Sequence, residues 1–118
     1  MRIRNVLIAA FVAGLPGIAW SAEPAGDVAR GEKVFIHHLC HTCHGTVGQG
    51  GERGAGPKIA PGVWPYAAFA QQVRKPRLVM IPYSEKTLPE QELVDMHAYL
   101  SAVKASPLAK DVLLLREF

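Results

Sequence analysis

Two cysteines and a histidine within five residues constrain this chain more than any other feature of its sequence. Cys40 and Cys43 are separated by two residues, and His44 follows the second cysteine directly. A Cys-x-x-Cys-His run is the attachment sequence of c-type haem. One short turn can present both sulfurs to the two vinyl groups on one edge of the porphyrin, and the next imidazole can bind the iron. The run therefore predicts one covalently bound haem c, attached through Cys40 and Cys43, with His44 as the proximal iron ligand.

Three other uses of two closely spaced cysteines are open at this point. A thioredoxin-like redox pair is found near a βαβ pattern, but no alternation of apolar and polar residues here predicts strands. A zinc ion could be held by Cys40, Cys43 and two histidines, although structural zinc sites usually take their second ligand pair from a remote segment. A disulfide between the two cysteines is the third alternative. The histidines nearby in the sequence are His37, His38, His41 and His44.

The composition agrees with a small domain that needs a bound group to complete its core. The 118 residues allow one domain, and the 11 glycines and nine prolines predict long loops between a few helices. A small, loop-rich chain often requires a disulfide, a metal or another bound group in addition to its own apolar side chains. Two cysteines are too few for a disulfide framework, so we expect the haem to supply the missing apolar bulk.

The first 22 residues have the pattern of a secretory signal peptide. Arg2 and Arg4 precede a short apolar run over residues 6–13, and small residues follow it. The apolar run is shorter than the roughly twenty residues that span a bilayer. We therefore expect cleavage near Ser21 or Ala22, export to the periplasm, and no transmembrane span in the mature form. An uncleaved N-terminal anchor is the alternative.

The charge of the chain does not indicate nucleic-acid binding. The formal net charge is +3, and removal of the two arginines of the signal peptide lowers it to +1. Basic and aromatic residues are also not interleaved in the way that proteins binding single strands require. We therefore expect no nucleic acid among the partners.

Beyond the signal peptide, at residues 1–22, the sequence predicts a helical domain over residues 23–106 and a tail over residues 107–118. Apolar residues at helical spacing predict helices over residues 26–39, 65–76 and 87–106. A Thr-x-x-Glu capping box is expected at the start of the last helix.

Met80 is the candidate for the second iron ligand. It lies in the loop before the last predicted helix, and Pro82 follows it closely. Ligation by histidine and methionine raises the reduction potential of a haem and suits electron transfer. Two alternatives remain, namely that Met80 fills space in the core or that the distal side of the iron is open. Met96 falls in the apolar stripe of the last helix, so we expect it in the core.

Together these residues resemble the small class I cytochromes c, over a stretch of about residues 26–103. The attachment run is the most specific part of the match. Gly31 and Phe35 stand where the N-terminal helix of that family has a small residue and an aromatic. Tyr99 and Leu100 look like their partners on the C-terminal helix, so the resemblance implies that these two helices cross closely.

Two loop segments extend the resemblance. Gly56 and Pro57 are similar to the turn whose proline carbonyl accepts the Nδ1 proton of the proximal histidine. Met80, with Pro82 two residues later, is similar to the loop that carries the axial methionine. In the family the proline more often follows the methionine directly, whereas Ile81 intervenes here.

The resemblance implies an all-α fold, the small cytochrome c fold, in which three to four helices and long loops surround one haem c. It implies an electron carrier rather than an enzyme, with redox proteins as partners. Pro57, Trp64, Tyr66 and Arg74 are expected at the cofactor, the last three as contacts of the haem propionates. Packing within the loops is the alternative for Trp64 and Tyr66.

Three functions are consistent with the sequence. The first is an electron shuttle that accepts electrons from a dehydrogenase and passes them to an oxidase or another cytochrome of the respiratory chain. The second is a dedicated cytochrome subunit of a flavin or quinone dehydrogenase, which the apolar residues 112–115 of the tail favour. The third is an enzyme or gas sensor with an open distal site.

A docking surface for redox partners is expected where basic residues are densest. Arg74, Lys75 and Arg77 lie just before the Met80 loop and could steer an acidic partner. An ordinary solvated turn and an apolar ring around the haem edge are the alternatives.

Overall fold

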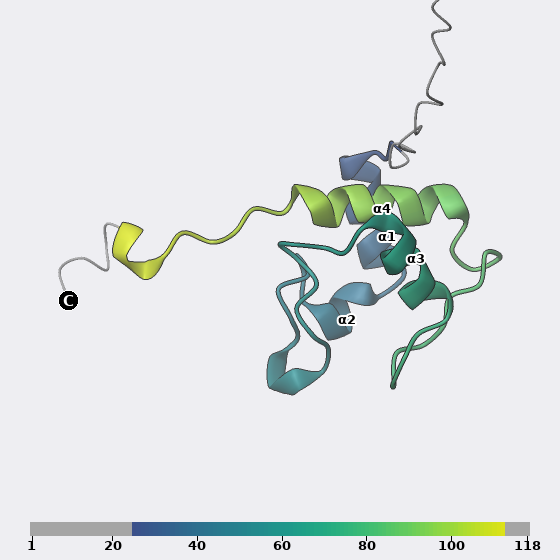
Figure 1. The fold of residues 1–118 in the computed structure, drawn as a ribbon, viewed down its shortest axis with the longest axis horizontal. Helices are drawn as coiled ribbons and strands as arrows, with labels where there is room; N and C mark the ends of the chain where they lie inside the picture. Colours follow the sequence, from purple (N-terminus) through teal and green to yellow (C-terminus); the bar gives the residue numbers. More distant parts are fainter. Residues whose placement is uncertain (1–24, 113–118) are drawn as a thin grey trace, which may run out of the picture.

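The computed structural model describes residues 25–112, which fold into four α-helices joined by long loops (Figure 1). No strand occurs within this range, so the predicted all-α fold is confirmed. The helices are α1 (Val28–His37), α2 (Cys40–His44), α3 (Tyr66–Arg74) and α4 (Glu90–Ala102). Two short 3-10 turns, η1 (Glu52–Gly54) and η2 (Ala109–Asp111), lie in the connecting and C-terminal segments.

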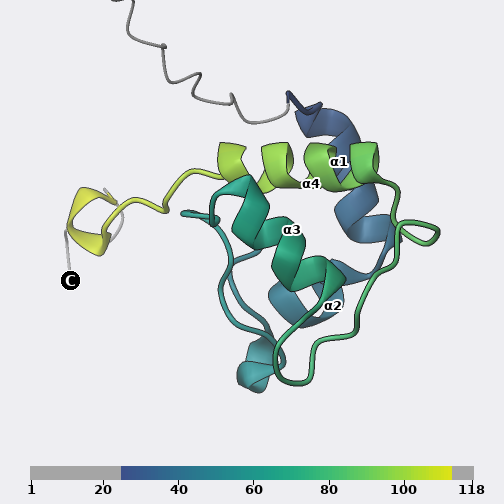
Figure 2. The ribbon, with the colours of Figure 1, turned by 45° about the vertical axis from the view of Figure 1, so that its right-hand side comes forward.

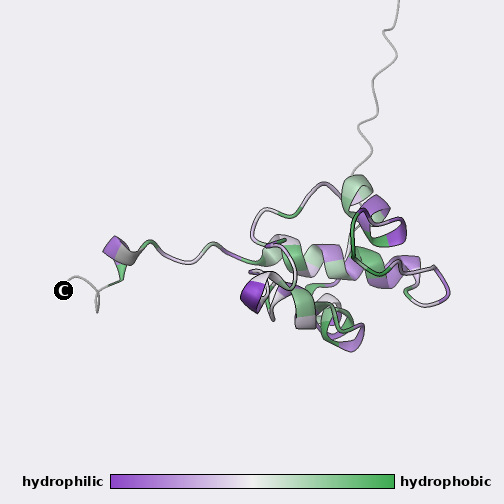
Figure 3. Cartoon of the chain, turned by 90° about the horizontal axis from the view of Figure 1, so that it is seen from below, coloured by the Kyte–Doolittle hydropathy of each residue, from purple (hydrophilic) through white to green (hydrophobic). Residues whose placement is uncertain are grey.

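Helix α4 is the element against which α1 and α3 both pack (Figure 2). The short helix α2 follows α1, and the two long loops lie on the same side of α4 as α2 (Figure 1). Apolar and hydrophilic residues alternate along the helices (Figure 3), as expected of helices that bury one face. Met96 is buried in the core, as predicted. The largest fully buried side chains of the described residues are Phe35, Leu88, Leu93, Leu100 and Asp95.

The crossing of α1 and α4 depends on a glycine. A Cβ atom at Gly31 would overlap the backbone carbonyl of Asp95, so only glycine permits this approach. One turn further along α1, the ring of Phe35 lies 5.8 Å from the ring of Tyr99, centroid to centroid. The predicted close crossing of these two helices is therefore confirmed.

A buried carboxylate on α4 also holds α1 and α4 together at this crossing. Asp95 is only 1% exposed, and it accepts hydrogen bonds from Arg30 Nε at 2.5 Å and from the Asp27 backbone N–H at 2.8 Å. Gln91 Nε2 donates a further bond at 3.0 Å. Asp27 in turn caps α1 by accepting from the Arg30 backbone N–H at 2.7 Å. Mainly because of the hydrogen bond from Arg30, the pKa of Asp95 falls to about 2.

The start of α4 differs from the prediction. The helix begins at Glu90, with Pro89 at its N-cap and no side-chain capping bond, so the expected capping box is wrong. The Thr87 backbone N–H instead donates to Ser84 O at 3.1 Å within the preceding turn. Glu90 is in the first turn of the helix and accepts hydrogen bonds from Tyr66 Oη and from the Arg74 guanidinium on α3.

The chain leaves the helical body after α4 (Figure 1), and Leu108 is exposed on this segment. The predicted signal peptide, residues 1–22, lies outside the described residues, and so do residues 113–118 of the predicted tail. The proposed roles of these two segments stay predictions.

We predict that replacing Asp95 by Asn changes how the stability of the holoprotein depends on pH. The carboxylate stabilises the fold above its ordinary pKa of 3.8, and this contribution is lost as the pH falls through about 2. Asp95→Asn should therefore lower the free energy of unfolding near pH 7 by about 2 kcal/mol. The variant should also lose less stability than the wild type between pH 4 and pH 2.

Denaturant unfolding across this pH range measures both effects. Asp111→Asn, at an exposed position on the C-terminal segment, is the matched control and should behave as the wild type. Equal pH slopes for Asp95→Asn and the wild type would show that this carboxylate does not link α1 to α4.

Candidate functional site

The whole Cys-x-x-Cys-His run forms the short helix α2. Residues three apart lie on one face of a helix, so the Cys40 and Cys43 sulfurs face the same way. The two cysteines are not joined by a disulfide; Cys40 packs against the core and Cys43 is exposed. Burial raises the pKa of the Cys40 thiol to about 11. The helix is entered through Leu39 in the left-handed region (φ 60°) and left through Gly45 (φ 78°), so both ends turn sharply.

The imidazole of His44 is held in one orientation by the loop that follows α2. His44 Nδ1 donates a hydrogen bond to the Pro57 carbonyl at 2.8 Å, which is the contact that the resemblance implies. Because the carbonyl can only accept, Nδ1 carries the proton and Nε2 is the nitrogen left to bind a metal. Nε2 has no hydrogen-bond partner among the residues that the structure describes.

Two glycines bring this loop against the backbone of α2. A Cβ atom at Gly51 would overlap the Cys43 carbonyl oxygen. A Cβ atom at Gly56 would lie 2.6 Å from the same oxygen and 3.1 Å from His44 Nδ1. Both positions exclude any larger residue, and this close approach is what places the Pro57 carbonyl within reach of the imidazole.

Met80 turns toward the protein body while its neighbours point away. Its side chain is half-buried and packs against the core, and Gln72 Nε2 lies 3.9 Å from its sulfur. Leu78, Val79 and Ile81 are 96%, 98% and 70% exposed. The structure thus places one thioether of this loop toward the core, and binding of the iron by Met80 stays a prediction.

Arg74 and Tyr66 both form hydrogen bonds to the carboxylate of Glu90, whereas the resemblance implies that they contact the haem propionates. Arg74 Nη1 donates to the carbonyls of Tyr83 at 3.2 Å and Leu88 at 2.6 Å, and its Nη2 lies 3.0 Å from Glu90 Oε2. Tyr66 Oη donates to the other oxygen of Glu90. These two hydrogen bonds, that from Tyr66 first, lower the pKa of Glu90. The role of Tyr66 and Arg74 at the haem propionates stays a prediction.

Trp64 lies at the start of the segment that leads into α3. Its carbonyl is hydrogen-bonded to His97 Nε2 at 2.8 Å, and its side chain is half exposed. The indole lines a hollow of about 320 Å³ along α3, and its contact with a propionate stays a prediction. The hollow is lined by Trp64, Ala68, Gln71, Gln72, Lys75 and Arg77.

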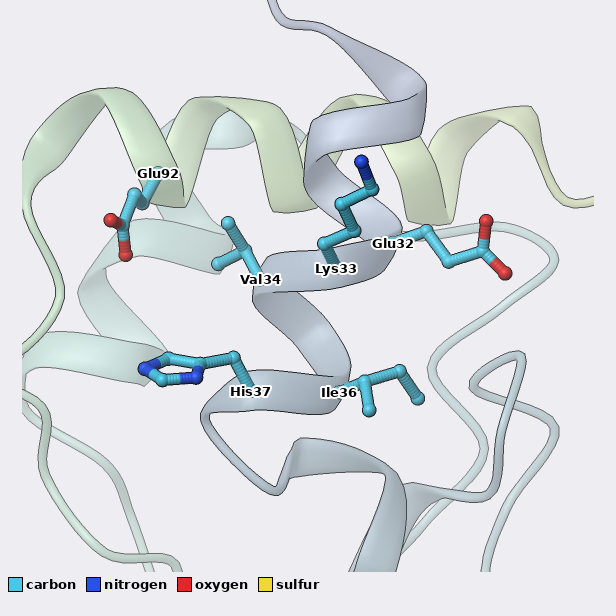
Figure 4. Close-up of a pocket in the computed structure, with 6 residues that line it drawn as sticks. All are labelled: Glu32, Lys33, Val34, Ile36, His37 and Glu92. Carbon is cyan, nitrogen blue, oxygen red and sulfur yellow. The ribbon is translucent and has the colours of Figure 1, made fainter.

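A larger open hollow, of about 600 Å³, lies over α1 and is separate from the attachment run (Figure 4). Its lining mixes charged and apolar side chains and includes none of the residues of α2. The lining residues are Glu32, Lys33, Val34, Ile36, His37 and Glu92. Within residues 25–112, no group of three or more histidine, cysteine or carboxylate side chains is arranged to hold a metal ion.

The donor set around α2 fits haem c. Two cysteines share one face of the helix, an imidazole oriented through its Nδ1 follows them, and a half-buried methionine lies in a separate loop. Apolar side chains that the protein only partly covers pack against the core, and an apolar group such as haem can complete the burial of those near α2. These side chains are Cys40, Ile59, Val63, Tyr66, Ala70, Met80, Tyr83 and Val103.

Several residues that organise the site were not identified by the sequence patterns. Asp95 interrupts the apolar stripe of α4, and this interruption is a usable sign of a buried ion pair. Tyr83 and the pair of His38 with Glu92 (2.9 Å between Nε2 and Oε2) give no such sign, since their partners are remote in the sequence.

Comparison with known proteins gives one family match. The sequence profile of the family described as cytochrome c oxidase, cbb3-type, subunit III matches residues 26–100. No curated protein and no solved structure matches the chain. Among the described helices, none has both the length and the apolar character needed to cross a membrane.

Proposed function

The chain belongs to the family of cytochrome c oxidase, cbb3-type, subunit III, a c-type cytochrome family that binds haem c covalently, and from this premise we propose that it is a periplasmic electron-transfer protein. The haem, when bound, supplies one-electron exchange between Fe(II) and Fe(III). The observation that supports this function best is the His44 imidazole, whose Nδ1–H is held by the Pro57 carbonyl and which directly follows the two cysteines of α2. That hydrogen bond fixes the ring and leaves Nε2 as the nitrogen that can bind a metal.

The residues of α2 would hold the cofactor and set its environment. Cys40 and Cys43 would provide the thioether sulfurs, and His44 would provide the proximal ligand. The hydrogen bond to Pro57 O fixes the ring and makes Nε2 a stronger donor to the metal, which is the usual effect of a partner on the second histidine nitrogen.

Met80 is the proposed distal ligand, and it makes the site one for electron transfer rather than for substrate binding. Its half-buried sulfur and the donor from Gln72 support this role. If His44 and Met80 both bound the iron, no position would remain for a small ligand, and the same two residues would hold the iron in both oxidation states. This arrangement favours a carrier over an open-site enzyme or gas sensor.

The proposed partners are a dehydrogenase as electron donor and an oxidase or another cytochrome as acceptor. Arg74 is engaged inside the protein, where its side chain is 16% exposed. The basic cluster predicted from the sequence is therefore reduced to the exposed residues Lys75 and Arg77, which border the hollow along α3. This surface can steer an acidic partner.

A second candidate function is a dedicated subunit of a dehydrogenase. The chain beyond α4 extends away from the helical body (Figure 1) and exposes Leu108. Such a segment could bind along the surface of a partner subunit.

Replacing Met80 by Ala should open the distal side of the iron. We expect Met80→Ala to lose the sulfur-to-iron charge-transfer band of the ferric protein and to bind carbon monoxide at least tenfold more tightly when reduced. Absorption spectroscopy measures both. Met96→Leu is the matched control, because it removes the buried methionine of α4 with little change in volume and should keep the band. A wild-type protein that already binds carbon monoxide as avidly as Met80→Ala would contradict the proposal.

Reversing the charge at Lys75 and Arg77 should change the rates of electron exchange with charged reagents. The double substitution to Glu should slow oxidation of the reduced protein by anionic hexacyanoferrate several-fold at low salt and speed oxidation by a cationic cobalt phenanthroline complex. Both effects should fade as salt rises above about 0.15 M. Stopped-flow absorbance gives the rates.

The single variants Lys75→Glu and Lys104→Glu change the net charge equally, and Lys104 is exposed beyond α4, so Lys104→Glu is the matched control for Lys75→Glu. If the two single variants altered both rates equally, the steering surface would not lie beside the Met80 loop.

A further inference from the structure

Met80 is a half-buried apolar side chain of its loop, residues 77–83, and its neighbours along the chain do not help to hold it. Leu78 and Val79 are almost entirely solvent-exposed and Ile81 is mostly exposed, so burial of these residues does not fix the position of Met80 between them. Further restraint comes from polar contacts at the ends of the loop. Near its start, the Arg77 backbone N–H lies 3.4 Å from Gln72 Oε1, which is a long contact.

At the other end of the loop, Tyr83 makes three hydrogen bonds to two separate parts of the fold. Its backbone N–H donates to Val73 O at 3.1 Å, and its carbonyl accepts from Arg74 Nη1 at 3.2 Å. Both of these partners belong to the end of α3. Its hydroxyl donates to His38 O at 3.0 Å, across 45 residues of sequence.

The carbonyl of His38 is a fixed point close to the attachment helix. His38 is the C-cap of α1 and lies two residues before Cys40. Its imidazole is paired with Glu92 on α4 at 2.9 Å and lies edge-on to the Tyr83 ring, with 6.0 Å between centroids. The backbone that receives the Tyr83 hydroxyl is therefore held by both α1 and α4.

The Tyr83 hydroxyl is suited to act as a permanent donor. Burial raises the pKa of Tyr83 above its ordinary value. The phenol is therefore neutral across the physiological pH range and keeps the proton that it donates to His38 O.

We propose that Tyr83 is a positioning residue, which ties the Met80 loop to the backbone entering the attachment helix and so holds the Met80 sulfur toward the distal face of the haem. This inference rests on the proposed role of Met80 as distal ligand. The Tyr83 hydroxyl would then couple the Met80 loop to α2, the two segments that supply the proposed iron ligands.

The test compares two tyrosines that make the same bond. Tyr83→Phe removes the hydroxyl that donates to His38 O at 3.0 Å, and Tyr99→Phe removes one that donates to Thr46 O at 3.0 Å. Both variants should lose similar global stability. Only Tyr83→Phe should bind added imidazole more tightly in the ferric holoprotein, by about fivefold, the factor that one typical net hydrogen bond represents.

Proteolysis gives a second readout, which does not depend on the iron. Trypsin can cut the Arg77–Leu78 bond, whereas Pro76 protects the bond after Lys75. We expect Tyr83→Phe to be cut after Arg77 about fivefold faster than the wild type under native conditions, and Tyr99→Phe to be cut at the wild-type rate. Mass spectrometry identifies the cleaved bond.

The outcomes separate this inference from the proposed function. Equal imidazole affinities and equal cleavage rates for the two tyrosine variants would overturn the role of Tyr83 while leaving Met80 as a ligand. If Met80→Ala binds imidazole no more tightly than the wild type, Met80 is not the ligand, and the positioning role falls with it. Tighter imidazole binding by Met80→Ala and by Tyr83→Phe, but not by Tyr99→Phe, supports both.

Discussion

The close approach of α1 to α4 at Gly31 is the constraint on which the rest of the structure depends. A side chain at this position would collide with the Asp95 carbonyl, and the Asp95 carboxylate below it ties the start of α1 to α4 through Arg30 and the Asp27 backbone. The C-terminal end of α1 leads through Leu39 directly into the attachment helix. One helix crossing therefore sets the position of both thiols and of the His44 imidazole.

The N-terminal end of α4 helps to position the loop that contains Met80, the proposed second iron ligand. Glu90 and Glu92 lie in its first turn and bind, respectively, Arg74 at the end of α3 and His38 at the end of α1. Tyr83 joins the same two partners through hydrogen bonds of its own. The loop that presents Met80 is thus attached by polar bonds to helices that already pack on each other, so its exposed apolar side chains are free for other contacts.

The parts of the fold that could be predicted from the sequence are those with a local pattern or a specific motif. The aspartate that caps α1 precedes an apolar helical repeat, and Gly31 with Phe35 marks the face that meets Tyr99. The bonds made by Arg74 were not predictable, because an arginine in a basic run gives no sign that backbone carbonyls and a glutamate will surround it. The capping box failed for a similar reason, since Glu90 is occupied by Tyr66 and Arg74.

The central claim is that the α2 segment carries a haem bound through both cysteine sulfurs. Its most direct test is mass spectrometry of the peptide containing Cys40 and Cys43, taken from full-length protein produced with export and haem-attachment machinery. The account predicts a red protein whose peptide is heavier by one haem and keeps that mass after acid and organic extraction. A colourless protein, or a peptide with two free thiols, a disulfide or a zinc ion, would contradict it.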